Sequence, residues 1–114
     1  MSPLDYSFCN QAVTLYRRQG DKICRRQLHK CYFSLEETYS QDGFGSKVRK
    51  KCRLIVPGAT PLFAGDRVYP GVGPEVEAEA WDSFVPANVP GLAVLGWVKT
   101  YFWENTPCHT EAGC

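Results

Sequence analysis

The sequence has almost no net charge and no long hydrophobic segment. It holds 13 lysines and arginines against 12 aspartates and glutamates, a formal net charge of +1. Dedicated nucleic-acid binders usually carry a strong basic excess, so this balance argues against that class. The longest apolar run, Pro90–Val98, contains two glycines and is far shorter than the roughly 20 residues of a membrane span. The N-terminus lacks the three regions of a secretory signal, and we expect a soluble intracellular protein without membrane contact.

Recognisable catalytic and metal-binding patterns are also missing. The six cysteines include no C-x2-C pair of the kind that binds structural zinc. The only two histidines, His29 and His109, have no nucleophile or carboxylate at a diagnostic spacing. The glycine-rich segments 42–45 and 70–74 lack the Lys-Ser/Thr ending of a phosphate-binding loop. We therefore predict no enzymatic activity, no cofactor and no metal.

The cysteines are predicted to be free thiols, because disulfide frameworks belong to secreted proteins and no secretory signal is present. In this interpretation Cys31 and Cys52 are small core residues. Cys9 and Cys114 are expected in mobile termini.

What the sequence does contain is short strand patterns separated by turns. The clearest strand is 48–56, which alternates between an apolar face (Val48, Cys52, Leu54 and Val56) and a cationic face (Arg49, Lys51 and Arg53). This alternation is typical of a half-buried antiparallel strand. Further strands are expected at 13–16, before Tyr69, over 93–103 and over 108–112, with a turn at Glu104-Asn105. Segment 75–80 fits either a strand or a helical turn.

The region before the basic strand is less regular. Residues 22–35 end in a strand or form one long bent strand throughout. Residues 36–46 are polar, contain Asp-Gly, and are predicted to form a long hairpin loop. Together these patterns predict an all-β fold, a small six-stranded antiparallel β-barrel with one long hairpin loop. The chain is expected to be one domain over 1–114, with 1–11 as a flexible or docking N-terminal segment.

The neutral total conceals a charge asymmetry between the two halves. Residues 1–53 carry a net charge of +6, whereas residues 54–114 carry −5. The acidic side is concentrated in Glu75, Glu77, Glu79 and Asp82. Paired catalytic carboxylates or a hard-metal site would need partners from elsewhere, and a solvated acidic edge is the favoured interpretation. Such asymmetry concerns interaction surfaces rather than fold.

The order of these features resembles a known group of assembly proteins. It runs through Leu15–Arg18, Cys31–Phe33, the polar segment, Leu54–Pro57, Gly65–Gly71, Trp103 and the final Cys108–Gly113. This order resembles small proteins from the structural-gene clusters of tailed phages and prophages. It is also similar, more loosely, to head-closure (stopper, head–tail joining) proteins.

The resemblance implies a non-enzymatic virion protein, assembled in the bacterial cytoplasm as a ring at the neck. Its implied partners are other copies of itself, portal and adaptor proteins of the head, and tail proteins. In stopper proteins a long loop reaches into the channel and makes transient contact with packaged double-stranded DNA. Carried over by position, the channel candidates are Glu36, Glu37, Tyr39, Gln41, Asp42 and Phe44.

A ring needs two different patches on each subunit, and the charge asymmetry offers them. We expect the cationic strand 47–53 of one subunit, through Arg49, Lys51 and Arg53, to face the acidic segment 75–82 of the next. A tail-completion or minor tail protein is the alternative within this class. An oligonucleotide-binding β-barrel is the alternative from another class, because basic residues that suit phosphate backbones and aromatic residues that suit base stacking are both present. Against it, Tyr101 and Trp103 lie on a strand flanked by acidic residues and not among the basic ones.

Overall fold

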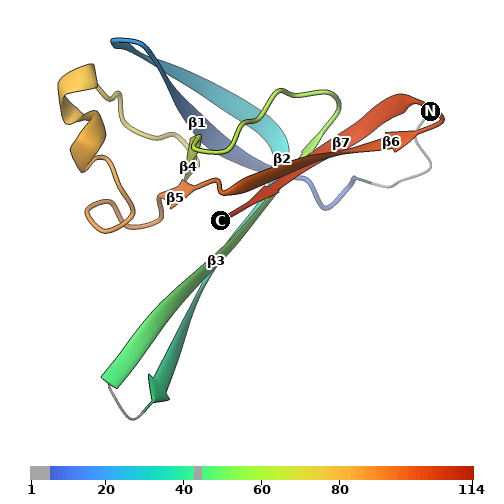
Figure 1. Ribbon diagram of the computed structural model, residues 1–114. Coiled ribbons are helices and arrows are strands. Elements are labelled where there is room, and N and C mark those ends of the chain that lie inside the picture. Colours follow the sequence, from blue (N-terminus) through green and yellow to red (C-terminus); the bar gives the residue numbers. More distant parts are fainter. Residues whose placement is uncertain (1–5, 43–44) are drawn as a thin grey trace.

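The protein is an antiparallel β-sheet protein with one short 3-10 helix (Figure 1). The computed structural model describes residues 6–42 and 45–114, with side chains described outside 37–50. Its elements are β1 (Gln11–Gln19), β2 (Lys22–Asp42), β3 (Gly45–Pro57), β4 (Arg67–Pro70), η1 (Ala78–Ser83), β5 (Ala93–Val94), β6 (Trp97–Trp103) and β7 (Thr106–Gly113). The strand order is β5-β4-β1-β2-β3-β7-β6, and the sheet is curled into a half-barrel. The predicted all-β class is confirmed.

Strand β2 is the long bent strand that was one of two predictions for its region. Its first part pairs with β1, from Lys22 opposite Gln19 to Cys31 opposite Gln11. Its second part pairs with β3, beginning with Tyr32 opposite Ile55. Between these two ladders Lys30 has a φ of 57°, in the left-handed region that non-glycine residues rarely adopt. The bend at this residue lets one strand serve two parts of the curled sheet.

The main core fills the concave side of the sheet. Its buried side chains come from six of the seven strands and from the loops between them (Val13, Leu15, Leu28, Cys31, Phe33, Cys52, Leu54, Val56, Leu62, Val68, Ala93, Leu95 and Ala112). The predicted alternation of the basic strand is confirmed from Lys51 to Leu54, where charged residues are exposed and Cys52 and Leu54 are buried. A single core of this extent accounts for the stability of a small β-domain.

Strand β1 is buried on both faces, which explains its run of consecutive buried residues. Val13 and Leu15 face the main core. Tyr16 lies on the opposite face and packs with Trp81, Phe84 and Leu92 in a second cluster. The η1 segment therefore covers the outer face of β1.

The predicted long hairpin loop at 36–46 is wrong. Strand pairing continues from Glu36 opposite Lys51 to Asp42 opposite Gly45, so the polar segment belongs to a two-stranded antiparallel ribbon. β7 ends opposite Arg53, and beyond that point β2 and β3 pair with each other and extend away from the sheet as an arm (Figure 1). We call residues 36–42 and 45–51 the arm. The radius of gyration is 15.5 Å, whereas a compact chain of this length has about 13 Å.

The predicted strand 93–103 is interrupted, so the sheet has seven strands rather than the expected six. β5 and β6 lie at opposite ends of the strand order, yet Leu95 and Gly96 alone separate them in the chain. The backbone of Leu95 donates to the Asp66 carbonyl and accepts from the Gly65 N–H. The Gly96 N–H donates to the Gly113 carbonyl of β7. The two ends of the sheet are thus linked by two residues of chain.

Turn and helix predictions for the second half have mixed outcomes. The Glu104-Asn105 turn is confirmed: both residues have positive φ, 48° and 66°, which suits a tight hairpin between β6 and β7. Segment 75–80 does not form a strand, and its second half enters the 3-10 helix η1. In the described part of the chain, no helix has both the length and the apolar character needed to cross a membrane.

Two cysteine predictions are also wrong. Cys52 and Cys114 form a disulfide with a Cα–Cα distance of 5.3 Å, so Cys114 is tied to the core strand β3. Cys9 is buried, with an exposed fraction of 5%. Residues 1–5 of the expected docking segment lie outside the described residues, but from Tyr6 onward this segment contacts the sheet: the Phe8 ring packs edge-on against Tyr32 at 5.7 Å. Phe8, Cys9 and Cys114 are thus held by tertiary contacts that the sequence pattern does not show.

Candidate functional site

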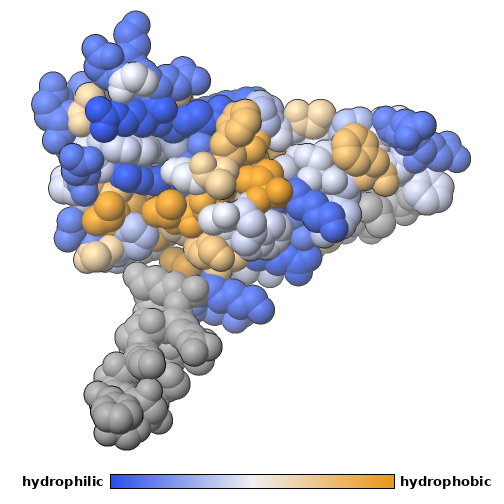
Figure 2. Space-filling view, in the orientation of Figure 1, coloured by the Kyte–Doolittle hydropathy of each residue, from blue (hydrophilic) through white to orange (hydrophobic). Residues whose placement is uncertain are grey.

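Three surface features carry the candidate functional residues: the arm, the acidic segment 75–82, and the edge strand β6. The structure holds the arm and the acidic segment apart, at the bottom and the upper left of the view in Figure 1. In the view of Figure 2, apolar side chains form a band across the middle of the molecule, and hydrophilic side chains cover the η1 side and the tip of the β1–β2 hairpin.

The cationic residues of β3 are partly neutralised inside the chain. Lys51 lies opposite Glu36 across the arm ladder, and both residues are exposed. The Arg53 guanidinium donates to the Glu111 carboxylate at 3.1 Å. Arg49 lies opposite Thr38 farther along the arm. Of the cationic face predicted from the sequence, Lys51 and Arg53 are exposed, and the ion pair with Glu111 reduces the free positive charge at Arg53.

The predicted channel residues lie on a strand instead of a loop. Glu36, Glu37, Tyr39, Gln41 and Asp42 are in β2, opposite residues 51, 50, 48, 46 and 45 of β3. The sixth candidate, Phe44, lies outside the described residues.

The acidic residues sit on a segment that is held at both ends. Glu75 and Glu77 precede η1, whereas Glu79 and Asp82 lie within it, and all four are exposed. At the start of the segment, the buried Tyr16 hydroxyl donates to the Pro74 carbonyl at 2.6 Å. This hydrogen bond fixes the acidic segment against β1.

Arg67 holds the other end of the acidic segment. Its guanidinium lies 3.6 Å from the centroid of the Trp81 ring and donates to the carbonyls of Trp81 and Phe84. Burial lowers the pKa of Arg67, while the nearby charge of Asp82 acts in the opposite direction. A cation over an indole ring and two carbonyl acceptors together define the position of η1.

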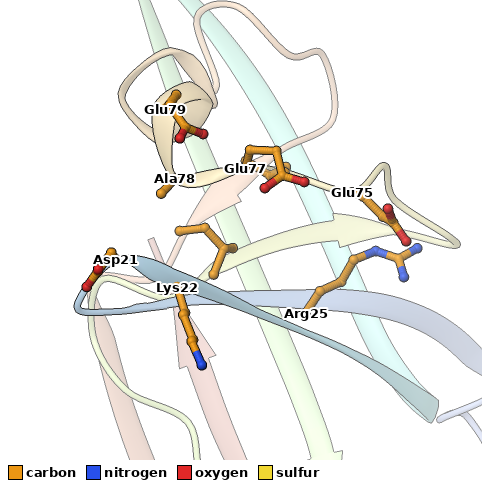
Figure 3. A pocket seen from close by; sticks show the side chains of 9 residues that line it. Asp21, Lys22, Arg25, Glu75, Glu77, Ala78 and Glu79 are labelled. Atoms are coloured by element: carbon orange, nitrogen blue, oxygen red, sulfur yellow. The ribbon is translucent and has the colours of Figure 1, made fainter.

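An open pocket of about 540 Å³ separates the acidic segment from the β1–β2 hairpin. It is lined by Asp21, Lys22, Ile23, Arg25, Glu75, Val76, Glu77, Ala78 and Glu79. The Arg25 guanidinium donates to the Gly73 carbonyl and is turned toward the Glu75 carboxylate, whereas Lys22 points away from the glutamates (Figure 3). Of the predicted interface glutamates, Glu75 therefore has a basic residue of its own chain, Arg25, beside it, and all of them are exposed to solvent.

His109, for which the sequence offers no partner, is a buried residue at the centre of a partly buried hydrogen-bond chain. Its Nδ1 lies 2.6 Å from the Tyr6 hydroxyl, and its Nε2 lies 3.2 Å from the Glu111 carboxylate, which also accepts from Arg53. The Tyr101 ring stacks on the imidazole with centroids 4.7 Å apart. The chain connects the N-terminal segment, β7 and the base of the arm. This arrangement gives His109 a structural role in holding three segments together.

Strand β6 carries three exposed aromatic side chains whose exposure sequence reasoning missed. Trp97, Phe102 and Trp103 have exposed fractions of 44%, 62% and 51%. The strand was recognised from its aromatic content, but nothing in the pattern distinguishes an edge strand from a central one. The exposure follows from the position of β6 at the end of the strand order.

Within the described residues, no group of three or more histidine, cysteine, aspartate or glutamate side chains is arranged to hold a metal ion. No protein-family model, no curated protein and no solved structure matches the chain.

Proposed function

We propose that this chain is a non-enzymatic virion structural protein of a tailed phage, a head-closure component that forms a ring at the head–tail junction. The proposal combines the resemblance in the order of sequence features with the surfaces described above. A tail-completion protein is the alternative within the same class. The partners in this proposal are further copies of the chain, portal and adaptor proteins, tail proteins and, transiently, packaged DNA.

The arm is the observation that carries the proposal. A two-stranded ribbon without a covering layer is only marginally stable in water. Along the arm, β3 has lost its neighbour β7, which ends opposite Arg53. A small domain that extends such a ribbon gains stability when the ribbon packs against another chain, and this is the behaviour of an assembly arm. In the proposed ring the arm contacts a neighbouring subunit or lines the channel.

The charge distribution supports a heterologous contact between subunits. The arm and the acidic segment 75–82 lie on different parts of the molecule, so one copy can present its arm to the acidic segment of the next. The Arg53–Glu111 ion pair reduces the charge available at the base of the arm. Arg49 and Lys51 are therefore expected to contribute more to the contact than Arg53.

The proposal also includes the detailed architecture of the fold, which is a closed six-stranded β-barrel. If residues 93–103 are counted as one bent strand, its first part pairs with β4 and its last part pairs with β7. The backbone hydrogen bonds of Leu95 and Gly96 support this interpretation, because they continue the links to both neighbours. The barrel would then contain β1, β2, β3, β7, the bent strand and β4.

Virion particles test the proposed function directly. Particles released after induction of a lysogen that carries the gene are purified, and the chain is located by antibody labelling in the electron microscope. We expect label at the junction of head and tail and several copies per particle. Absence of the chain from purified particles would overturn the proposal, and label at the distal tail would favour the tail-protein alternative.

The subunit contact is tested by charge reversal. The variant Arg49→Glu/Lys51→Glu/Arg53→Glu should weaken ring assembly, most strongly at low salt where charges are least screened. Because Arg53 also binds Glu111, the single variant Glu111→Gln serves as a control for the loss of that ion pair. Normal assembly of the triple variant at low ionic strength would show that this pairing is wrong.

A DNA titration separates the proposal from the oligonucleotide-binding alternative. Trp97 and Trp103 are exposed, so stacking of single-stranded bases on them would change their fluorescence. We expect an unchanged signal on titration with a single-stranded oligonucleotide at physiological salt. A saturable change that weakens steeply with salt would favour the binding barrel.

A further inference from the structure

β6 is an edge strand with an unusual composition, because it is rich in exposed aromatic residues. In the strand order β6 is the last strand, and its ladder is with β7 on one side. Natural sheets normally protect such edges with charges, prolines or covering segments, because the free N–H and C=O groups template the addition of another strand. Here the edge carries Trp97, Phe102 and Trp103, which are three of the six exposed large hydrophobic residues in the described part of the chain.

The sequence of β6 is self-complementary when the β6 strands of two copies pair antiparallel, with the two-fold axis at the central residue Thr100. In that register Trp97 of one copy lies opposite Trp103 of the other, and Val98 lies opposite Phe102. Lys99, the single charged residue of the strand, lies opposite Tyr101. Aromatic and aliphatic pairs directly opposite each other are the favourable pairs of antiparallel sheets.

Other two-fold registers are less favourable. A register centred on Lys99 places two like charges opposite each other, which destabilises an antiparallel pair. A register centred on Tyr101 leaves Trp97 without a strand residue opposite it. The register about Thr100 uses all seven residues of β6 and opposes no like charges. Lys99 already contacts an aromatic face within one chain, since its Nζ lies 4.8 Å from the centroid of the Tyr101 ring.

We propose that β6 is a strand-pairing interface between two copies of this chain, formed around a two-fold axis at Thr100. The pairing would join two sheets edge to edge and cover the exposed aromatic residues. It differs from the heterologous ring contact and does not depend on the proposed function, because it uses another surface and another symmetry.

The expected affinity is low. Burying three partly exposed aromatic side chains on each copy removes roughly 300 Å² of apolar surface per copy, which is well below the standard interface size. We therefore expect a dissociation constant on the order of 0.1 mM, in the range of weak and transient pairs.

Site-specific cross-linking tests the register. In a Cys24→Ser background, which removes the exposed free thiol, Thr100→Cys places two thiols directly across the two-fold axis. Directly opposite residues have Cα atoms about 4.5–5.5 Å apart, which a disulfide spans. The control Glu104→Cys is also on an exposed residue, but its two copies would lie about 26 Å apart in this register.

Mild oxidation should give a covalent dimer with Thr100→Cys and none with Glu104→Cys. Equal cross-linking of both variants, or cross-linking of neither, would overturn the proposal. Sedimentation equilibrium of the unmodified protein provides a second readout: Phe102→Lys should weaken dimerisation at least tenfold, whereas Val72→Lys, at an exposed residue outside β6, should not change it. A protein that remains monomeric at 1 mM, taken as about ten times the expected dissociation constant, would contradict the pairing.

Discussion

The Arg17 guanidinium binds the buried Asp66 carboxylate through two parallel hydrogen bonds. Nε lies 2.9 Å from Oδ1, and Nη2 lies 2.7 Å from Oδ2. The Asp66 side chain is 3% exposed and also accepts the Phe63 N–H at 2.9 Å. Side-chain hydrogen bonding to Asp66 raises the pKa of Arg17. This pair connects β1 to the loop before β4. The backbone carbonyl of the same Asp66 accepts the Leu95 N–H, so the pair also holds the Leu95-Gly96 link between the two ends of the sheet.

Removal of the Asp66 carboxylate should destabilise the fold clearly. Asp66→Ala leaves the Arg17 guanidinium and the Phe63 N–H without this acceptor, so we expect a loss of about 2–3 kcal/mol in the free energy of unfolding. Arg18→Ala, on an exposed neighbour in β1, should change it by less than about 0.5 kcal/mol. Chemical denaturation with guanidinium measures both, and equal stability of the two variants would contradict this role of Asp66.

Gly73 and Tyr16 are packed too closely for a side chain at residue 73. A Cβ there would collide with the Tyr16 hydroxyl, which is buried and donates to Pro74. Gly73→Ala should therefore cost about 1–3 kcal/mol through overpacking. Tyr16→Phe alone should cost about 1 kcal/mol for the lost hydrogen bond.

The double variant identifies the collision as the cause. Tyr16→Phe/Gly73→Ala removes the hydroxyl that the new methyl group meets, so it should be less destabilised than the sum of the two single variants. Thermal unfolding of the four proteins completes the cycle. Strict additivity would mean that the cost of Gly73→Ala arises elsewhere.

The Cys52–Cys114 disulfide should stabilise the protein substantially. It links residues 62 positions apart, and the chain-entropy model assigns such a cross-link about 4 kcal/mol. Cys114→Ser, made at the exposed partner, should lower the denaturation midpoint to that of the reduced protein. Cys24→Ser should leave the midpoint unchanged, because Cys24 is exposed and free. A reducing agent that fails to shift the midpoint of the unmodified protein would show that this disulfide does not form in solution.

The buried thiols give stability a dependence on alkaline pH. Burial raises the pKa of Cys31 from 9.0 to about 11, and the nearby Cys9 acts in the same direction. The folded state therefore retains a proton that the unfolded state loses between pH 9 and about 11. Stability from this group is complete below pH 9 and decreases as the pH rises toward 11.

Two measurements check the thiol prediction. The free energy of unfolding should fall less steeply from pH 9 to 11 in Cys31→Ala than in the unmodified protein. At pH 8 a thiol-reactive dye should label exposed Cys24 rapidly and the buried Cys9, Cys31 and Cys108 slowly. Rapid labelling of Cys31 in the folded protein would contradict the burial on which the pH dependence rests.

Local strand content was predictable because it depends on neighbouring residues. The alternation of Lys51 to Leu54 and the turn at Glu104-Asn105 follow from side-chain periodicity and turn chemistry, whereas the periodicity of residues 22–35 left the bent strand as one of two alternatives. The prediction of a loop at 36–46 failed because local polarity does not reveal whether a segment pairs with another strand. Polar residues at 36–42 are typical of loops, yet the backbone of this segment pairs with β3 from Glu36 opposite Lys51 to Asp42 opposite Gly45.

The candidate sites were likewise predictable only in their local features. The charges of residues 49–53 and 75–82 are visible in the sequence, and so is their asymmetry. Their surroundings are not: the Arg53–Glu111 pair joins residues 58 positions apart, and Arg25 reaches the backbone of Gly73 across 48 positions. Each residue of these pairs can be read from the sequence, but short-range sequence patterns do not predict contacts between residues so far apart in the chain.

The sequence by itself determined the all-β class, most strand positions and two oppositely charged segments, because these depend on composition and short-range periodicity. Only the tertiary structure decided that the polar segment is an arm, that Cys114 is tied to Cys52, and that the aromatic strand β6 lies at an edge. These features depend on which strands become neighbours, and strand order is set by long-range packing of the whole core rather than by any one segment.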